Sequence, residues 1–205
     1  MSDARSVILE RIRAAAPPGA RNLVEADYRR TLGLDRGELV ALFAARIVEY
    51  DVGVLYATCA ELATALARAA AEHGAHRFAI PADLPTAWRP RELALVRDRA
   101  LTNAELDGLD GAITGSALAI AETGTIVLDC GPAQGRRALT LIPDLHLCVV
   151  FADSIVGTVP EAVDRISVDR PITFVSGPSA TSDIELTRVR GVHGPRRLEV
   201  VIAQR

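Results

Sequence analysis

A segment rich in glycine and hydroxyl side chains, residues 176–185 (SGPSATSDIE), has the composition of an anion-binding loop. It follows an apolar run that predicts a strand, and the spacing of Ser182 and Glu185 is typical of a capping box at a helix start. Free N–H groups at a helix start attract anions, and Gly177 allows close approach of the main chain. Ligands of open α/β sheets bind where strands end. We therefore predict a phosphate or carboxylate site here; the alternative is an ordinary strand–helix loop whose hydroxyls cap the helix.

A second candidate is the turn formed by Glu122, Thr123 and Gly124, which lies in an uncharged, β-rich stretch. A carboxylate buried there without a partner would be costly. Burial would raise its pKa and suit it to acid–base or nucleophilic chemistry. A surface hairpin turn with Glu122 in water explains the same residues equally well.

Histidine and arginine side chains supply further candidates. His193 lies in the segment GVHGP (191–195) and could be a general base or an anion contact, although a structural turn is the alternative. His146 lies in an apolar run and is expected to be a core residue. Arg136 and Arg137, in a glycine-rich loop, could bind an anionic substrate or form a solvated surface pair.

Composition excludes several classes of protein. The chain has 205 residues, of which 49% are hydrophobic and 24% charged, so it can fold around a sizeable core. Its formal charge of −3 gives no sign of a nucleic-acid-binding surface. All 23 basic residues are arginine, which excludes a Walker A loop, a pyridoxal phosphate Schiff base and a lysine nucleophile.

Cysteine and histidine usage argues against a metal or cluster site. The three cysteines, Cys59, Cys130 and Cys148, are too few to hold an iron–sulfur cluster, and their sparse use suits a reducing cytoplasm. We expect Cys130 to be a buried, inert thiol. The four histidines show no HExxH spacing, and no metal site is expected. The charged first residues lack the apolar core of a signal peptide, so we expect a cytoplasmic protein without membrane insertion.

The pattern of elements predicts where these side chains lie. Helical periodicity over 4–15 and 36–50 indicates a helical N-terminal extension, residues 1–50, that packs on an α/β domain, residues 51–205. Capping boxes begin at Thr58, Thr102 and Thr158. The alternation of strands and helices predicts an α/β fold with a parallel-rich sheet flanked by helices, and an antiparallel insert within 111–128. The main predicted strands are 52–57, 77–80, 93–96, 145–151, 172–175 and 198–203.

Four runs of sequence carry a family resemblance. They are ETGTIVLD (122–129), GRRALTLIPDLHLCVV (135–150), IVGTVPEAV (155–163) and RPITFVSGPSATSDIELTRVRGVHGP (170–195). Together they closely resemble the lactate utilisation protein C family, the LUD-domain proteins. The resemblance implies a fold related to the NagB/RpiA/CoA-transferase superfamily. It also implies a part in a bacterial system that oxidises L-lactate to pyruvate and whose companion subunits carry the iron–sulfur clusters.

We therefore expect a small anionic ligand between the 177–185 loop, the Glu122 turn and the 193–195 turn; whether the chain binds a cofactor is unknown from the sequence. One alternative is a non-catalytic module that docks on an iron–sulfur partner. Another is a transferase or isomerase for a CoA ester or sugar phosphate, because CoA transferases carry a nucleophilic Glu-Asn-Gly turn, here with Thr123 in place of asparagine. The expected catalytic residues are Glu122 and His193, and the expected substrate-binding residues are Thr123, Gly124, Gly177, Pro178, Ser179, Ala180, Thr181, Asp183 and Gly194.

Overall fold

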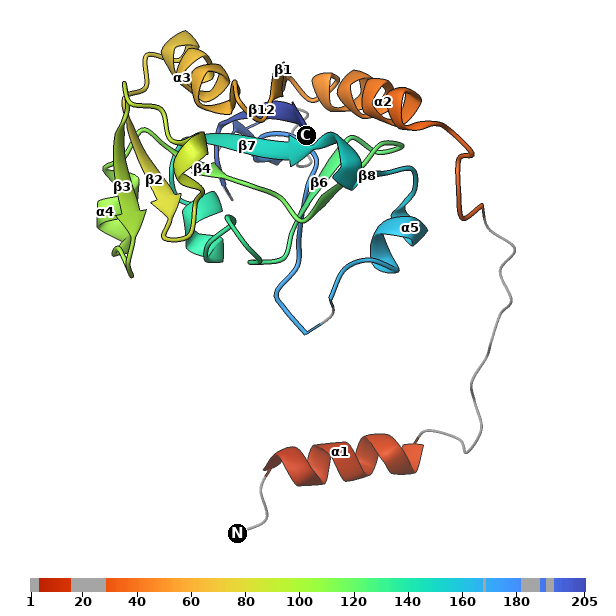
Figure 1. Cartoon of the computed structure of the whole chain (residues 1–205). Helices are drawn as coiled ribbons and strands as arrows, with labels where there is room; N and C mark the ends of the chain where they lie inside the picture. The colour runs from red at the N-terminus through yellow and green to blue at the C-terminus, as the bar shows by residue number, and fades with distance from the viewer. Residues whose placement is uncertain (1–3, 16–28, 168, 182–188, 191–193) are drawn as a thin grey trace.

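The computed structural model describes residues 4–15, 29–167, 169–181, 189–190 and 194–205; for 180, 181, 189 and 190 only the backbone is described. The body of the molecule is built on a six-stranded sheet in which every pair of neighbours is parallel (Figure 1). The expected α/β fold with a parallel-rich sheet is therefore confirmed. In order across the sheet, the strands are β1 (Gly53–Thr58), β12 (Arg197–Gln204), β7 (Leu145–Phe151), β4 (Gly111–Thr114), β2 (Arg77–Pro81) and β3 (Ala94–Asp98).

The central strands are apolar because both of their faces are covered. Successive residues of β7 point to opposite faces, so Leu147 and Val149 pack with α3 (Leu62–Glu72), whereas Cys148 and Val150 pack with α2 (Arg36–Val48). The two helices thus cover opposite faces of the sheet. From α2, the buried side chains are Val40, Phe43, Ala44 and Ile47, and each large one contributes roughly 2 to 3 kcal/mol through burial.

A second, four-stranded sheet packs on the α2 face. Its order is β8 (Ile155–Val156), β5 (Leu118–Ile120), β6 (Thr125–Leu128) and β9 (Thr173–Val175). The β5–β6 and β6–β9 pairs are antiparallel, which confirms the antiparallel insert expected within 111–128, although β4 of that stretch belongs to the parallel sheet. Ala119, Ile126 and Leu128 share a hydrophobic cluster with α2 and thereby join the second sheet to the body.

Of the four predicted capping boxes, two are confirmed, and the one at Ser182 lies outside the described residues. Thr102 caps α4 (Asn103–Asp107) and Thr158 caps α5 (Val159–Val163), each with the glutamate three residues on bonding back to the main chain. At Thr58 the prediction is half right: Glu61 accepts from the backbone N–H of Thr58 at 3.0 Å, but Thr58 does not cap the helix. Thr58 is the last residue of β1, and α3 begins only after Glu61, which makes no side-chain cap.

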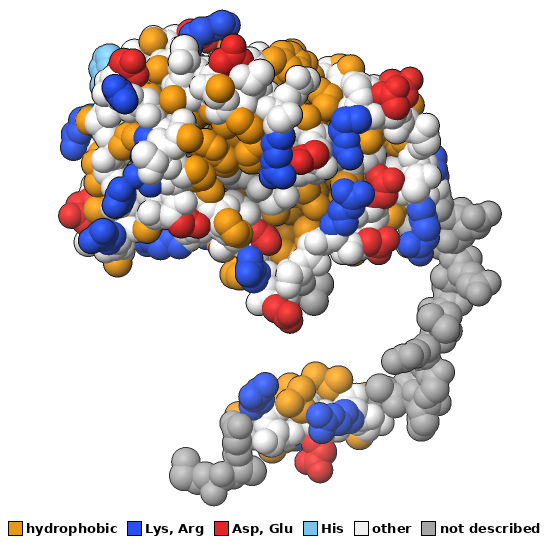
Figure 2. All heavy atoms as spheres, in the orientation of Figure 1, with side chains coloured by type: hydrophobic (Ala, Val, Ile, Leu, Met, Phe, Trp, Pro, Cys, Tyr) orange, Lys and Arg blue, Asp and Glu red, His pale blue; other side chains and the backbone are white. Residues whose placement is uncertain are grey.

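The predicted helices of the N-terminal extension differ in their packing. The second, α2, packs on the core as expected, whereas α1 (Ala4–Ala15) buries no residue and is drawn apart from the body in Figure 1. Apolar side chains gather on the surface of α1 beside charged ones (Figure 2). No helix in the described part of the chain combines the length and apolar character needed to cross a membrane.

Short elements complete the described structure. The loop after β9 leads into β10 (Ala180–Thr181), which pairs antiparallel with β11 (Val189–Arg190). The expected helix start at Ser182 and Glu185 lies outside the described residues. Cys130, expected to be buried, is exposed at a turn with φ of +55°. The remaining elements are η1 (Thr86–Trp88), η2 (Arg137–Thr140) and η3 (Ala152–Ser154).

Candidate functional site

The loop that follows β9 lines a cavity of about 320 Å³. The cavity also reaches the starts of β7 and β12, where His146 and Leu198 are the second residue of their strands. It therefore opens at the edge of the parallel sheet that carries the amino ends of the strands, and we name it the amino-edge cavity. Its lining consists of Arg137, Thr140, Leu141, His146, Thr173, Phe174, Val175, Ser176, Gly177, Pro178, Ser179, Gly194, Pro195 and Leu198.

Four of the residues predicted from sequence meet in this lining, namely Gly177, Pro178, Ser179 and Gly194. The backbone N–H of Ser179 donates to the carbonyl of Pro195 at 2.9 Å and joins the loop to the turn. Gly177 has φ of +96°, and a Cβ there would lie 2.5 Å from Cβ of Tyr50. Only glycine combines this backbone conformation with so close an approach to Tyr50.

The loop after β9 lies at the other edge of the sheet from the one expected. The loop after β9 was expected at the carboxyl ends of the parallel strands, where ligands of open α/β sheets usually bind. However, β9 belongs to the second sheet and runs antiparallel to β6, so its end turns back to the opposite edge. The polar loop and the cavity are both present, but they face the starts of β7 and β12.

The Glu122 turn lies beside the loop without lining the amino-edge cavity. The hydroxyl of Thr125 contacts Thr123 at 2.7 Å and Ser176 at 2.8 Å, so a chain of hydroxyls connects the turn to the lining. Gly124 has φ of +58° and packs on the end of α2, where a Cβ would lie 2.7 Å from the backbone nitrogen of Ile47. This close packing gives the turn a structural role.

Glu122 itself forms an ion pair with Arg29, and its side chain is 38% exposed. Glu122 is therefore neither buried without a partner nor simply in water: it is a paired carboxylate near the surface. Asp183 and His193 lie outside the described residues. Ala180 and Thr181 belong to β10, which extends the loop, and their side chains are not described.

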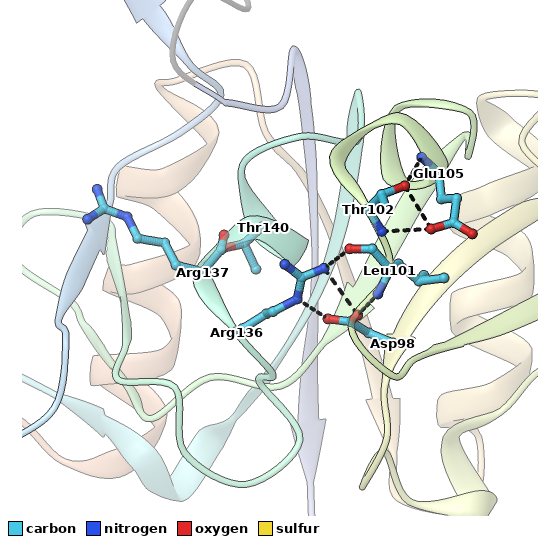
Figure 3. A network of polar contacts seen from close by, with 7 residues as sticks. All are labelled: Asp98, Leu101, Thr102, Glu105, Arg136, Arg137 and Thr140. Atoms are coloured by element: carbon cyan, nitrogen blue, oxygen red, sulfur yellow. Dashed lines mark hydrogen bonds and ion pairs between the residues drawn. The ribbon is translucent and has the colours of Figure 1, made fainter.

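The two adjacent arginines of the glycine-rich loop have different surroundings. Arg136 and Arg137 are neighbours, yet their guanidinium groups point in opposite directions (Figure 3). Arg136 donates to both carboxylate oxygens of Asp98, at 2.7 and 3.2 Å, and to the carbonyl of Leu101. Although burial opposes it, the hydrogen bonds from Arg136 and from the backbone of Leu101 hold the pKa of Asp98 below its ordinary value.

Arg137, in contrast, lines the amino-edge cavity and is exposed. Among the residues that the structure describes in the lining, it is the one with a permanent charge. No acidic side chain occurs in that described lining. A positively charged fork beside hydroxyls and glycine backbone has the chemistry to bind a small carboxylate or phosphate.

His146 lies at the buried end of the cavity. Its Nε2 lies 2.7 Å from the hydroxyl of Thr114, which also donates to the carbonyl of Gly115 at 2.9 Å. Burial lowers the pKa of His146 to about 4, so the ring is neutral at neutral pH. Burial likewise raises the pKa of the Cys148 thiol to about 12, and this group is no nucleophile. In the described residues, no group of three or more His, Cys, Asp or Glu side chains is placed to hold a metal ion.

Comparison with known proteins identifies the family. The model of the LUD domain matches residues 89–203. The chain belongs to the LUD domain family. Among relatives, "Lactate utilization protein C" of Deinococcus radiodurans is 46% identical over 90% of this chain and 88% of its own length. The protein of the same name from Geobacillus kaustophilus is 31% identical over 71% of this chain and 70% of its own length.

A solved structure shares the fold of this chain. The crystal structure of a DUF162 family protein from Deinococcus radiodurans matches with a TM-score of 0.73 and 42% identity, and the match covers 83% of this chain and 99% of that one. All the lining residues of the amino-edge cavity, from Arg137 to Leu198, fall within the matched LUD domain.

Proposed function

We propose that this LUD domain protein is a cytoplasmic component of a bacterial lactate utilisation system and binds a small carboxylate, L-lactate or pyruvate, in the amino-edge cavity. One observation carries the proposal: Arg137 is held in a small cavity without acidic neighbours in its described lining, while Arg136 next to it is engaged elsewhere. The names of the relatives supply the substrate class.

The lining gives each group a distinct role in this proposal. The Arg137 guanidinium pairs with the ligand carboxylate in a two-pronged contact. Ser176, oriented by Thr125, and the backbone at Gly177 bind the remaining oxygens. His146 offers a neutral polar ring, so it adds no charge that would compete with Arg137.

Oxidation of L-lactate to pyruvate releases a pair of electrons and two protons, which other groups must accept. With three cysteines in the chain, of which Cys148 is buried, we propose that the electrons pass to iron–sulfur clusters in partner subunits. His193, which directly precedes the cavity residue Gly194, is the proposed acid–base group. Glu122 retains that role only if Glu122→Gln abolishes lactate-dependent growth.

Calorimetric titration with L-lactate and pyruvate tests the binding step. Replacing Arg137 by glutamine removes a charge-assisted contact worth roughly 1.5 to 3 kcal/mol, so the affinity falls roughly tenfold or more. Arg136→Gln is the matched control, since it removes the same charge one residue away. It is expected to lower the unfolding free energy, because Asp98 loses its partner, while the affinity stays the same. Equal affinities of the wild type and Arg137→Gln would overturn the proposal.

A second candidate function, a docking module for an iron–sulfur partner, draws on one observation. The α1 helix leaves Ile8 and Ile12, one turn apart, 57% and 59% exposed, and an uncovered apolar face of this kind can bind a partner. Loss of the partner subunits in co-purification after removal of residues 1–15, with no effect of Arg137→Gln on lactate-dependent growth, would favour docking over ligand binding. The transferase alternative gains no support from Glu122, which is paired with Arg29 outside the cavity lining.

A further inference from the structure

A larger cavity, of about 610 Å³, opens at the other edge of the parallel sheet. Gly115 and Ser116 follow β4, Phe151 ends β7, and Arg205 follows β12; Trp88, in η1, follows β2. The lining therefore gathers the carboxyl ends of these parallel strands, and we name it the carboxyl-edge cavity. This edge is where open α/β sheets usually bind their ligands, and it is separated from the amino-edge cavity by the length of the strands.

Aromatic rings form one wall of this cavity. The rings of Trp88 and Phe151 lie 5.5 Å apart between centroids, inclined at 55°. The guanidinium of Arg205 lies 4.4 Å from the centroid of Phe151. A Cβ at Gly115 would lie 3.4 Å from the Trp88 ring, so a side chain there would press on the aromatic wall. Such a wall suits a planar ring, which gains from stacking on aromatic side chains.

Cations accompany the aromatic wall. Arg165 and Arg205 both line the cavity and are exposed. Arg205 also pairs with Asp153 at 3.1 Å, whereas the Arg165 guanidinium makes no ion pair or hydrogen bond to any residue that the structure describes. Arginine forks of this kind match the oxygens of a phosphate.

The acidic group in the lining is already engaged. Asp129 accepts hydrogen bonds from Nε2 of Gln134 at 2.7 Å and from the backbone of Gly131 at 2.9 Å, and its other oxygen lies 3.8 Å from Arg170. Asp129 is therefore engaged by the loop after β6 and by Arg170. Arg165 therefore remains for a ligand, whereas Arg205 would share its charge between a ligand and Asp153.

We propose that the carboxyl-edge cavity is a second ligand site, for a nucleotide-type molecule. The planar base stacks on the wall of Trp88 and Phe151, and the phosphate is bound by Arg165 and Arg205. The volume, nearly twice that of the amino-edge cavity, accommodates a ligand larger than lactate. The site does not depend on whether the amino-edge cavity binds lactate.

The chain contains a single tryptophan, Trp88, so its fluorescence reports on this cavity. Titration with AMP is expected to change the emission in a saturable manner. Adenosine lacks the phosphate and ribose 5-phosphate lacks the base, so both are expected to bind roughly tenfold or more weakly than AMP. L-lactate, which is expected at the opposite edge, leaves the emission unchanged. A negative AMP titration would reject only the second site, and a negative lactate titration by calorimetry would reject only the proposed lactate site.

Two variants separate the contacts, with affinity measured by calorimetry. Arg165→Gln is expected to weaken AMP binding roughly tenfold while adenosine binding stays the same. The control, Arg97→Gln, changes an exposed arginine on the edge strand β3 that lines neither cavity, and it should have no effect. Trp88→Leu, checked for retained folding by circular dichroism, should weaken the binding of both AMP and adenosine.

The proposal is overturned if AMP causes no saturable change in Trp88 emission. It is equally overturned if Arg165→Gln and Arg97→Gln bind AMP alike. If ribose 5-phosphate bound as tightly as AMP, the aromatic wall would contribute nothing to the affinity. If adenosine bound as tightly as AMP, the arginines would contribute nothing to it. Either result would reject a nucleotide-type ligand.

Discussion

At the scale of single residues, chemistry depends on which partner a side chain finds in the fold. Arg136 and Arg137 have the same side chain and adjacent positions. Arg136 is held by Asp98, whose side chain is only 5% exposed, and so stabilises the loop before η2. Arg137 points the other way and supplies the charge of the amino-edge cavity (Figure 3). The sequence showed two candidate anion contacts, and the structure leaves one of them available to a ligand.

His146 gives the protein a specific sensitivity to acid. Its folded pKa of about 4 lies below the ordinary value of 6.5, so the unfolded chain binds more protons between these values. The stability contributed by the neutral ring is complete above about pH 6.5 and is lost as the pH falls towards 4. We predict that this residue alone costs about 2 kcal/mol of unfolding free energy between pH ~7 and pH ~5.

Urea unfolding at the two pH values checks this prediction. His146→Gln keeps a polar partner for Thr114 but cannot titrate, so its stability should fall by about 2 kcal/mol less than that of the wild type. An identical loss in the two proteins would show that His146 does not titrate between folded and unfolded states.

At the scale of elements, helix starts illustrate the limits of a local motif. Thr58 and Thr102 are each followed three residues later by glutamate, and in both cases the hydroxyl donates to that glutamate, at 2.8 and 2.7 Å. Only Thr102 accepts from the backbone of a helix, at 3.3 Å from the nitrogen of Glu105. Thr58 belongs to β1, whose pairing with β12 extends to that residue. Strand pairing therefore decided where α3 begins.

The difference predicts unequal effects of the same substitution. Thr102→Ala should lower the unfolding free energy by about 1 kcal/mol, because α4 loses its cap. Thr58→Ala should cost clearly less, since it removes a surface hydrogen bond and no cap. Thr102→Ser is the control that keeps the cap. Equal losses for the two alanine variants in denaturant unfolding would contradict this assignment of the caps.

At the scale of the whole molecule, the parallel sheet separates two cavities of different chemistry. The amino-edge cavity is small, with one permanent charge in its described lining, and the carboxyl-edge cavity is larger and aromatic. The body that carries both is held together by clusters on the two faces of the sheet, to which α2 and α3 contribute. The α1 helix contributes no buried side chain to this body.

Removal of residues 1–15 should therefore leave the body intact. We predict an unfolding free energy within about 0.5 kcal/mol of that of the full chain, since surface segments contribute little to stability. Removal of residues 1–48, which also deletes Phe43 and Ile47, is the contrasting variant and should prevent folding. A large destabilisation by the first deletion would show that α1 packs on the body in solution.

Local sequence was enough to predict most of the main helices and strands and the class of fold. Apolar runs such as β7 and the capping box at Thr102 depend on neighbouring residues, so local periodicity and hydrogen bonding are enough to predict them. The same holds for the polar loop after β9, whose glycine and hydroxyl content is a local property.

Tertiary packing sets which edge of the sheet this loop faces and which residues lie beside it. Pairing of β9 with β6 is a contact between segments far apart in the chain, and it turned the loop to the amino edge. The same long-range packing placed Glu122 outside the cavity lining and brought Arg137 and His146 into it. Such placements follow from how distant apolar surfaces bury one another, and no local pattern encodes them.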